Sequence, residues 1–150
     1  MADEKLRILI VDDDEGITGS LSILLESEGY QTDVAHSVKD AVEKSYENYY
    51  NLAIIDIKLP DGEGTGLLKA LRETSPKTIK IMLTGYPTIG NSVNSLNDGA
   101  NAYLIKPLDL EVLLEKIKSK IEEQKASEMA TEESIAVFLQ TRSKKLLAEK

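Results

Sequence analysis

Short apolar runs alternate along the chain with longer stretches in which apolar residues recur every three or four positions. The short runs are rich in β-branched residues, and they predict five strands, at residues 6–11, 31–35, 52–56, 79–83 and 102–105. Each is followed by a stretch with helical spacing, as in Ile17, Leu21 and Leu24. The pattern therefore predicts five strand–helix repeats.

Five such repeats predict an α/β fold with a doubly wound five-stranded parallel sheet and five flanking helices. The strands are continuously apolar, as expected when helices cover both faces of a parallel sheet. If the strand order is the 2-1-3-4-5 of flavodoxin-like folds, the first and third strands are neighbours.

Candidate capping residues mark the ends of several predicted helices. Ser37, with Asp40 three residues later, is close to a capping box, Asp14 is a candidate N-cap, and Gly29 is a candidate C′ residue.

The last thirty residues have a different character. Residues 122–130 are polar apart from Met129, so we expect the fifth helix to fray or bend there. Thr131 then offers an N-cap for a separate helix that carries Ile135, Phe138 and Leu139 on one face. We accordingly divide the chain into a sheet domain at residues 1–121 and a polar linker with a C-terminal helix at 122–150.

The same C-terminal region contains part of a heptad pattern. Apolar residues fall on alternating steps of three and four at Leu114, Ile117, Ile121, Ile135 and Phe138. The intervening steps, Gln124, Glu128 and Thr131, are polar, and this argues against a continuous coiled coil. We expect the last helix to pack against its own domain or against a dimer partner.

Composition excludes several classes of protein. The 150 residues carry a net charge of -8, which disfavours nonspecific binding to nucleic acid or to anionic lipid. The chain has no cysteine and one histidine, which rules out disulfides, thiolate metal sites and multi-histidine sites. No apolar run reaches the length of a membrane span, and the N-terminus does not resemble a signal peptide. We expect a cytoplasmic protein that does not bind membranes.

Polar residues directly follow four of the predicted strands, and they define the candidate site. The first strand ends in Asp12, Asp13 and Asp14, the third in Asp56, the fourth in Thr84 and the fifth in Lys106. The carboxyl ends of parallel strands share one edge of a sheet, where ligands bind. Grouped carboxylates repel each other unless a cation lies between them, and oxygen ligands alone favour Mg²⁺, with Mn²⁺ also possible. A carboxylate nucleophile, a hydroxyl and an ammonium group beside Mg²⁺ suit phosphoryl transfer.

These residues resemble the response-regulator receiver domain of two-component signalling over roughly residues 5–120. The matching motifs are Ile8-Leu9-Ile10-Val11-Asp12-Asp13-Asp14-Glu15, Asp56 followed by Leu59-Pro60-Asp61-Gly62, Leu83-Thr84-Gly85, and Tyr103-Leu104-Ile105-Lys106-Pro107. Two segments, Leu83-Thr84-Gly85-Tyr86 and Lys106-Pro107-Leu108-Asp109, are most similar to receivers of nitrogen-regulatory type. Four motifs in register at the ends of four strands make the resemblance specific.

The resemblance implies a role for each of these residues. Asp56 would be the phosphoacceptor, and Mg²⁺ would be held by Asp12, Asp13, Asp56 and the backbone carbonyl of Lys58. Thr84 and Lys106 would bind the phosphoryl oxygens, and the Lys106–Pro107 peptide would be cis. Thr84 and Tyr103 would form the switch pair. Lys58 and Tyr86 would border the phosphate's water access, where their bulk predicts slow self-dephosphorylation.

The resemblance also implies partners. A sensor histidine kinase or phosphotransfer protein would supply the phosphoryl group, and the chain would catalyse only its own phosphorylation and dephosphorylation. The output would be a downstream protein, or a self-dimer formed through the face of the fourth and fifth helices or through the tail. We expect no direct binding to nucleic acid, and thirty residues are too few for a separate output domain.

Three alternatives compete with the receiver hypothesis. A receiver-like scaffold that is not phosphorylated would lack part of the acidic pocket, which is complete here. A Mg²⁺-dependent phosphatase of haloacid-dehalogenase type would need acids after the fourth strand, where this chain has Thr84-Gly85. A flavodoxin-like flavin binder would need small or hydroxyl residues in place of Asp12–Glu15. Simpler interpretations also exist for single residues: Tyr103 as strand packing, His36 as a surface loop residue, and Asp61-Gly62 and Gly64 as turn residues.

Overall fold

A computed structural model describes residues 5–85 and 100–148. Its centre is a parallel sheet of five strands, in the order β2-β1-β3-β6-β7. The strands are β1 (Arg7–Val11), β2 (Gln31–Ala35), β3 (Leu52–Asp56), β6 (Ile79–Thr84) and β7 (Ala102–Ile105). Counted along the chain, this is the order 2-1-3-4-5, so the predicted fold class is confirmed. The strand bounds agree with the prediction to within one residue.

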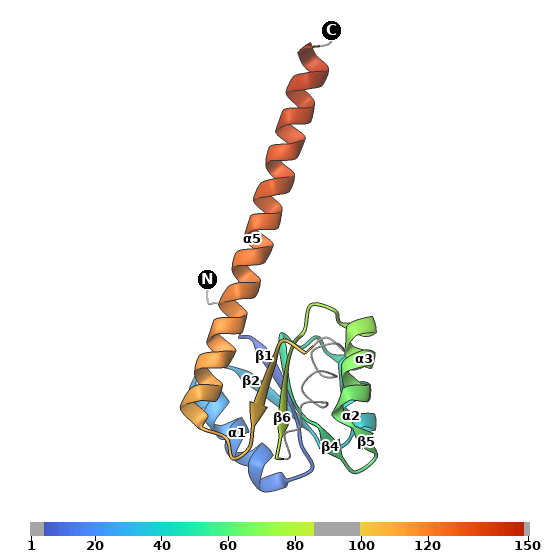
Figure 1. Cartoon of the computed structure of the whole chain (residues 1–150), viewed down its shortest axis with the longest axis vertical. Coiled ribbons are helices and arrows are strands. Elements are labelled where there is room, and N and C mark those ends of the chain that lie inside the picture. Colours follow the sequence, from blue (N-terminus) through green and yellow to red (C-terminus); the bar gives the residue numbers. More distant parts are fainter. Residues whose placement is uncertain (1–4, 86–99, 149–150) are drawn as a thin grey trace. The chain divides into compact units, whose positions relative to one another are not determined.

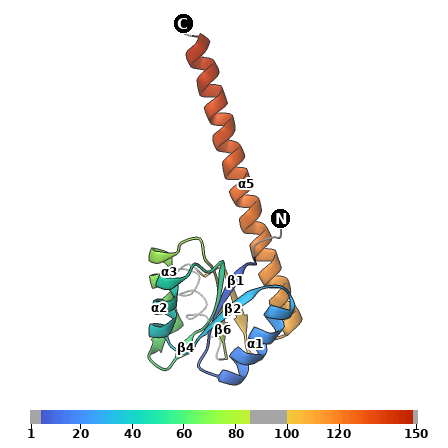
Figure 2. The same cartoon turned by 180° about the vertical axis from the view of Figure 1, so that it is seen from behind.

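The described helices are α1 (Glu15–Ser27), α2 (Val38–Glu47), α3 (Gly64–Thr74) and α5 (Leu110–Ala148). The remaining predicted helix, with Ile89, Val93 and Leu96, lies outside the described residues. In Figures 1 and 2, α2 and α3 lie side by side, away from α1.

Alternation along the strands divides the core between the two faces of the sheet. Alternate residues of β1 and β3 pack with Met82 of β6 and with the leucines of α3 in one cluster, whose strand members are Leu9, Val11, Ala53 and Ile55. The residues between them, such as Ile10 and Ile54, are equally buried and point to the other face. Every residue of β3 is buried, which explains its uninterrupted apolar sequence.

Side-chain caps begin two of the helices, as predicted. Asp14 accepts hydrogen bonds from the backbone N–H of Gly16 and Ile17 at 2.8 and 3.2 Å. Ser37 accepts one from the N–H of Asp40 at 3.1 Å. Gly29 has a φ of 96° just after α1, the left-handed conformation expected of a C′ glycine. The first turns of α1 and α2 are therefore specified locally.

A short hairpin follows β3, where the sequence indicated only a turn. Its strands are β4 (Lys58–Leu59) and β5 (Gly62–Glu63). At its tip, the Asp61 carboxylate accepts hydrogen bonds from the N–H groups of Val38 at 2.8 Å and Lys39 at 3.0 Å. The hairpin therefore adds a second cap to α2, which the sequence did not reveal.

The expected break in the C-terminal region is wrong, because α5 runs without interruption from Leu110 to Ala148. Thr131 lies inside the helix, and its hydroxyl donates to the Ser127 carbonyl at 2.9 Å instead of capping a new helix. Glu, Gln, Lys and Ala dominate residues 122–130, and these residues favour helix whether or not one face is apolar.

The chain divides into two compact units, Met1–Leu110 and Glu111–Lys150. The first unit contains the sheet with α1, α2 and α3, and the second is formed by α5. Over the described part of the chain, every helix is too short or too polar to span a bilayer.

Candidate functional site

Strand register brings the polar strand ends to one edge of the sheet. Val11 pairs with Ile55 and Asp56 with Leu83, while Thr84 pairs with Ile105. Asp12 and Lys106 are the residues directly after β1 and β7. The four strand ends that the sequence singled out therefore lie at the same edge and at nearly the same height.

Three carboxylates cluster there. Asp12, Asp13 and Asp56 each place one carboxylate oxygen within 4.8 Å of the others. Asp12 and Asp56 are 1% and 7% exposed, whereas Asp13 faces solvent. Buried carboxylates this close repel each other, and a divalent cation would relieve that repulsion. The donor set is all oxygen with one open side, and it fits Mg²⁺, which retains water ligands, better than it fits zinc or copper.

Lys106 reaches into this cluster and bridges its two buried members. Its Nζ lies 2.8 Å from Asp12 Oδ2 and 3.1 Å from Asp56 Oδ2. Its backbone N–H donates to the Thr84 carbonyl at 2.7 Å, which extends the pairing of β6 with β7. The Lys106–Pro107 peptide bond is cis, the isomer that the resemblance implied.

The electrostatics of the site follow from burial and from these contacts. Burial raises the pKa of Asp56 and the nearby Asp12 raises it further, while Lys106 and the Lys58 N–H act in the opposite direction without cancelling the rise. For Lys106, burial alone would lower the pKa, but hydrogen bonds to Asp12 and Asp56 outweigh it and raise the pKa. Lys106 is therefore a permanent cation here, and Asp56 is a carboxylate more basic than usual.

Backbone contacts hold the two buried carboxylates in place. Asp12 Oδ1 accepts from the Asp14 N–H at 3.0 Å, and Asp56 Oδ1 accepts from the Lys58 N–H at 3.2 Å. His36, to which the sequence assigned no role, places Nδ1 3.0 Å from the backbone carbonyl of Asp12. Each carboxylate is therefore oriented by its own loop before any ligand arrives.

Gly64, at the start of α3, permits the tight turn after Asp56. A Cβ on Gly64 would lie 2.3 Å from the Asp56 carbonyl oxygen and 2.9 Å from Ile55 Cγ2. The Gly64 N–H also donates to the Ile57 carbonyl at 2.6 Å. The close approach requires glycine, and sequence reasoning treated this residue only as part of a turn.

The two residues predicted to form the switch lie on the neighbouring strands β6 and β7. Thr84 ends β6 and is buried. Tyr103, in β7, is half-buried and packs against the core cluster on the α2–α3 face. Its hydroxyl oxygen is buried and has no hydrogen-bond partner among the described residues. Packing alone accounts for the inward ring, so the switching role of Tyr103 stays a prediction.

Of the two residues expected to border the phosphate, the structure describes only Lys58. Lys58 is exposed directly beside Asp56, while Tyr86 lies outside the described residues. Their effect on dephosphorylation stays a prediction, as does the Lys58 carbonyl as a metal ligand.

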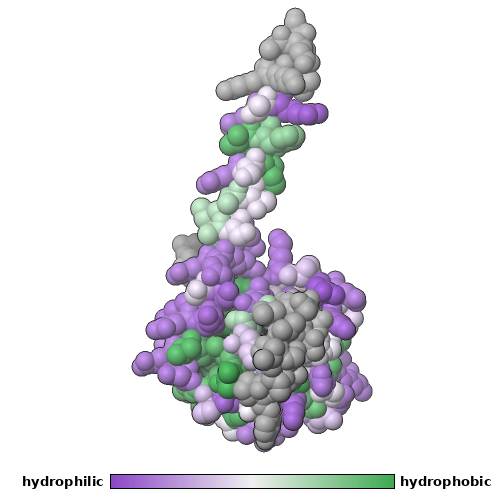
Figure 3. Space-filling view, in the orientation of Figure 1, coloured by the Kyte–Doolittle hydropathy of each residue, from purple (hydrophilic) through white to green (hydrophobic). Residues whose placement is uncertain are grey.

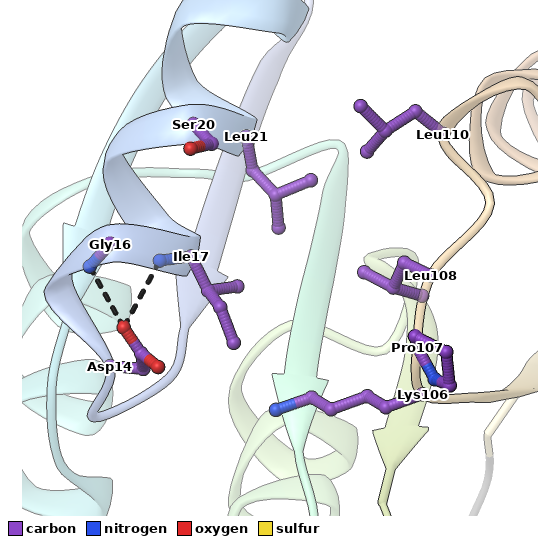
Figure 4. A pocket seen from close by; sticks show the side chains of 9 residues that line it. All are labelled: Asp14, Gly16, Ile17, Ser20, Leu21, Lys106, Pro107, Leu108 and Leu110. Atoms are coloured by element: carbon purple, nitrogen blue, oxygen red, sulfur yellow. Dashed lines mark hydrogen bonds between the residues drawn. The ribbon is translucent and has the colours of Figure 1, made fainter.

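A hydrophobic recess adjoins the acidic cluster (Figure 4). Ile17 and Leu21 of α1 face Leu108 and Leu110 across a cavity of about 470 Å³. Asp14, Lys106 and Pro107 also line it, so the recess and the cluster share the Lys106 side chain. The recess is therefore an apolar surface directly beside the acidic cluster.

Comparison with known proteins agrees with this geometry. Residues 8–118 match the family described as the response regulator receiver domain. The chain belongs to this family, and the resemblance to receiver domains that the strand-end motifs indicated is confirmed.

Two curated relatives are transcriptional regulatory proteins by name. YkoG of Bacillus subtilis, whose function is uncharacterised, is 37% identical over 118 residues, which are 79% of this chain and 52% of YkoG. TrcR of Mycobacterium tuberculosis is 30% identical over 132 residues, which are 88% of this chain and 51% of TrcR. The chain therefore spans about half the length of these relatives.

Solved structures show the same fold, and this chain matches nearly their whole length. A CheY-like receiver domain protein of Methanospirillum hungatei is 48% identical with a TM-score of 0.81, and the match covers 83% of this chain and 99% of that one. The beryllofluoride-activated NtrC4 receiver domain dimer is 37% identical with a TM-score of 0.75, covering 79% of this chain and 98% of that one.

Proposed function

We propose that the chain is a phosphorylation-dependent signalling switch that accepts a phosphoryl group on Asp56 in a Mg²⁺-dependent reaction. The observation that carries the proposal is the cluster of Asp12, Asp13 and Asp56 with the Lys106 ammonium between its two buried members. Lysine and paired carboxylates at a sheet edge also occur in structural ion pairs. Here the cluster opens to solvent at Asp13, as a site for an incoming phosphoryl group requires.

The chemistry is an in-line displacement. An Asp56 carboxylate oxygen attacks phosphorus, the bond from phosphorus to the donor nitrogen or oxygen breaks, and the donor leaves with the electron pair. Mg²⁺, when bound to Asp12, Asp13, Asp56 and the Lys58 carbonyl, supplies charge neutralisation for the phosphoryl oxygens. Lys106 moves its ammonium from Asp56 to a phosphoryl oxygen, and the Thr84 hydroxyl donates to another. The product is an acyl phosphate, which water later hydrolyses, so the chain catalyses only its own modification.

The same contacts transmit the signal. Phosphorylation adds charge beside Thr84 and draws its hydroxyl towards the phosphate. The Tyr103 ring, which already packs against the core cluster, is then held in this inward position, and the surface at β6 and β7 changes for a partner to recognise. Moving a two-state equilibrium from 1:99 to 99:1 requires about 5.5 kcal/mol, so the phosphate must bind the active state better by several kcal/mol.

The donor is a sensor histidine kinase or a phosphotransfer protein, and the recess lined by Ile17, Leu21 and Leu108 offers it an apolar docking surface. The target is a downstream protein or a second receiver. The relatives named as transcriptional regulators have a further half that this chain does not match. Any contact with nucleic acid would belong to such a longer protein.

Acetyl phosphate or beryllofluoride with Mg²⁺ tests the proposal directly. Intact-mass spectrometry should show one labile phosphate on the wild type, none on Asp56→Asn, and an unchanged signal on Asp40→Asn, a carboxylate in α2 paired with Lys44. EDTA should abolish the reaction. An unmodified wild type under these conditions would instead support the scaffold alternative.

A further inference from the structure

The C-terminal half of α5 exposes apolar side chains among hydrophilic ones (Figure 3). Leu113, Ile117 and Ile121 are buried, but from Glu122 to Arg142 every side chain is exposed apart from half-buried Gln124. The exposed stretch nevertheless contains five large apolar residues that are 54–61% exposed, namely Met129, Ile135, Val137, Phe138 and Leu139. Exposed apolar residues gathered in this way mark an interaction surface.

One face of this stretch carries a compact apolar strip between charges. Ile135 and Phe138 are three residues apart, so they lie on the same side of the helix with Leu139 next to them. Thr131 and Arg142 continue the strip at steps of four before Ile135 and four after Phe138. Ile135 and Phe138 line a shallow hollow whose other lining side chains are all small, namely Ser127, Ala130, Thr131 and Ser134. Small residues of this kind let a second helix approach closely.

The charges on either side of the strip are opposite in sign. Residues 128–133 contain Glu128, Glu132 and Glu133 and no basic residue. Residues 140–145 contain Arg142, Lys144 and Lys145 and no acidic residue. Two helices laid antiparallel with Ile135 against the partner's Phe138 bring residues 128–133 against the partner's residues 140–145, and the reverse. A parallel pair would instead place like charges together at both ends.

We propose that this strip is the contact surface for a second copy of the chain, and that two α5 helices pair antiparallel about a twofold axis between Ile135 and Phe138. The two symmetric Ile135–Phe138 contacts form the apolar centre, and the acidic and basic blocks flank it on both sides. Glu128 and Thr131, two of the polar positions that argue against a continuous coiled coil, then lie opposite the partner's basic block. This pairing is independent of the phosphorylation chemistry proposed above.

The expected dimer is weak, because its apolar centre is short and its area falls below that of standard stable interfaces. Analytical ultracentrifugation of the full chain should show a dimer fraction that becomes substantial at a protein concentration of about 100 μM in low salt. This fraction should fall when added salt screens the charges. Ile135→Glu should weaken the association by about 100-fold. Val137→Glu is the matched control, since Val137 is similarly exposed but lies on another side of the helix. A wild type that stays monomeric at about 500 μM would overturn the proposal.

Disulfide trapping determines the direction of the pair, because the chain has no cysteine of its own. In the antiparallel register Thr131 faces the partner's Arg142, whereas two copies of Thr131 are about 16 Å apart, beyond disulfide reach. Mixing Thr131→Cys with Arg142→Cys should therefore give the mixed disulfide, and Thr131→Cys alone should give little. Circular dichroism checks that each variant keeps its helix. Efficient self-linking of Thr131→Cys would show a parallel pair and contradict the proposal.

Discussion

At the scale of single residues, the proposed role of Asp56 as phosphoacceptor places opposing demands on it. A carboxylate that reacts with phosphorus must be ionised and accessible, yet Asp56 is 7% exposed and lies beside Asp12 in a cluster that repels added negative charge. Lys106 offsets part of this cost through its 3.1 Å contact with Asp56. The pKa of Asp56 stays raised, so ionising this group opposes folding when no cation is bound.

Asp56→Asn should therefore stabilise the metal-free protein at neutral pH, on the order of 1 kcal/mol, because it removes a buried charge next to Asp12. The sign of the pH dependence follows from the raised pKa. The wild type carries the penalty fully above the folded-state pKa of Asp56, and the penalty disappears below the ordinary aspartate value of 3.8. Urea unfolding in EDTA at pH 7 and at lower pH checks this. A variant less stable than the wild type at pH 7 would show that the Lys106 contact outweighs burial.

Asp12, Asp13, Asp56, Thr84 and Lys106 were all identifiable from the sequence, because each directly follows or ends an apolar strand. Gly64 and Asp61 were not. Their importance comes from the Asp56 carbonyl that Gly64 approaches and from the α2 backbone that Asp61 binds. A pattern of hydrophobic positions contains no information on contacts of this kind.

At the scale of elements, the β4–β5 hairpin links the loop after Asp56 to α2. Lys58, whose N–H orients Asp56, begins the hairpin, and Asp61 at its tip accepts two hydrogen bonds from the first turn of α2. These bonds, together with the positive charge of Lys39, hold the pKa of Asp61 below its usual range. Hydrogen bonds therefore fix both the first residue and the tip of the hairpin.

Asp61→Ala should lower the melting temperature and weaken Mg²⁺ binding together, because it frees the loop that positions Asp56 and Lys58. Asp61→Asn, which keeps one acceptor oxygen, is the control and should lose less. Since the pKa of Asp61 is lowered, its contribution to stability is present above the ordinary value of 3.8 and is lost as pH falls through the lower folded-state pKa. Thermal melting with Mg²⁺ titrations measures both effects. Unchanged Mg²⁺ affinity in Asp61→Ala would show that the hairpin does not position the site.

At the scale of the whole molecule, metal binding and folding are coupled. The three carboxylates converge only when β1 and β3 are paired in register, so the unfolded chain has no comparable site. A cation that binds only the folded form stabilises it by mass action. Stability therefore reports on occupancy of the site without any phosphoryl chemistry.

Mg²⁺ should accordingly raise the free energy of unfolding, by about 2.7 kcal/mol at a concentration one hundred times its dissociation constant. Asp13→Asn should lose most of this gain while leaving the stability of the metal-free protein nearly unchanged, because Asp13 is exposed. Denaturant unfolding with and without Mg²⁺ measures the difference. An equal gain in wild type and Asp13→Asn would place the cation elsewhere.

The sequence by itself determined the strands, the fold class and the strand-end residues, since periodic burial is a local property of the chain that the order of apolar residues records. The tertiary structure alone shows that Lys106 bridges Asp12 and Asp56 and that Asp61 caps α2 by binding backbone groups 22 and 23 residues earlier. Such contacts depend on how separate elements are placed in three dimensions. The continuity of α5 lies between these cases. Residues 122–130 favour helix through their local propensity, whereas the absence of amphipathic spacing among them predicts a break.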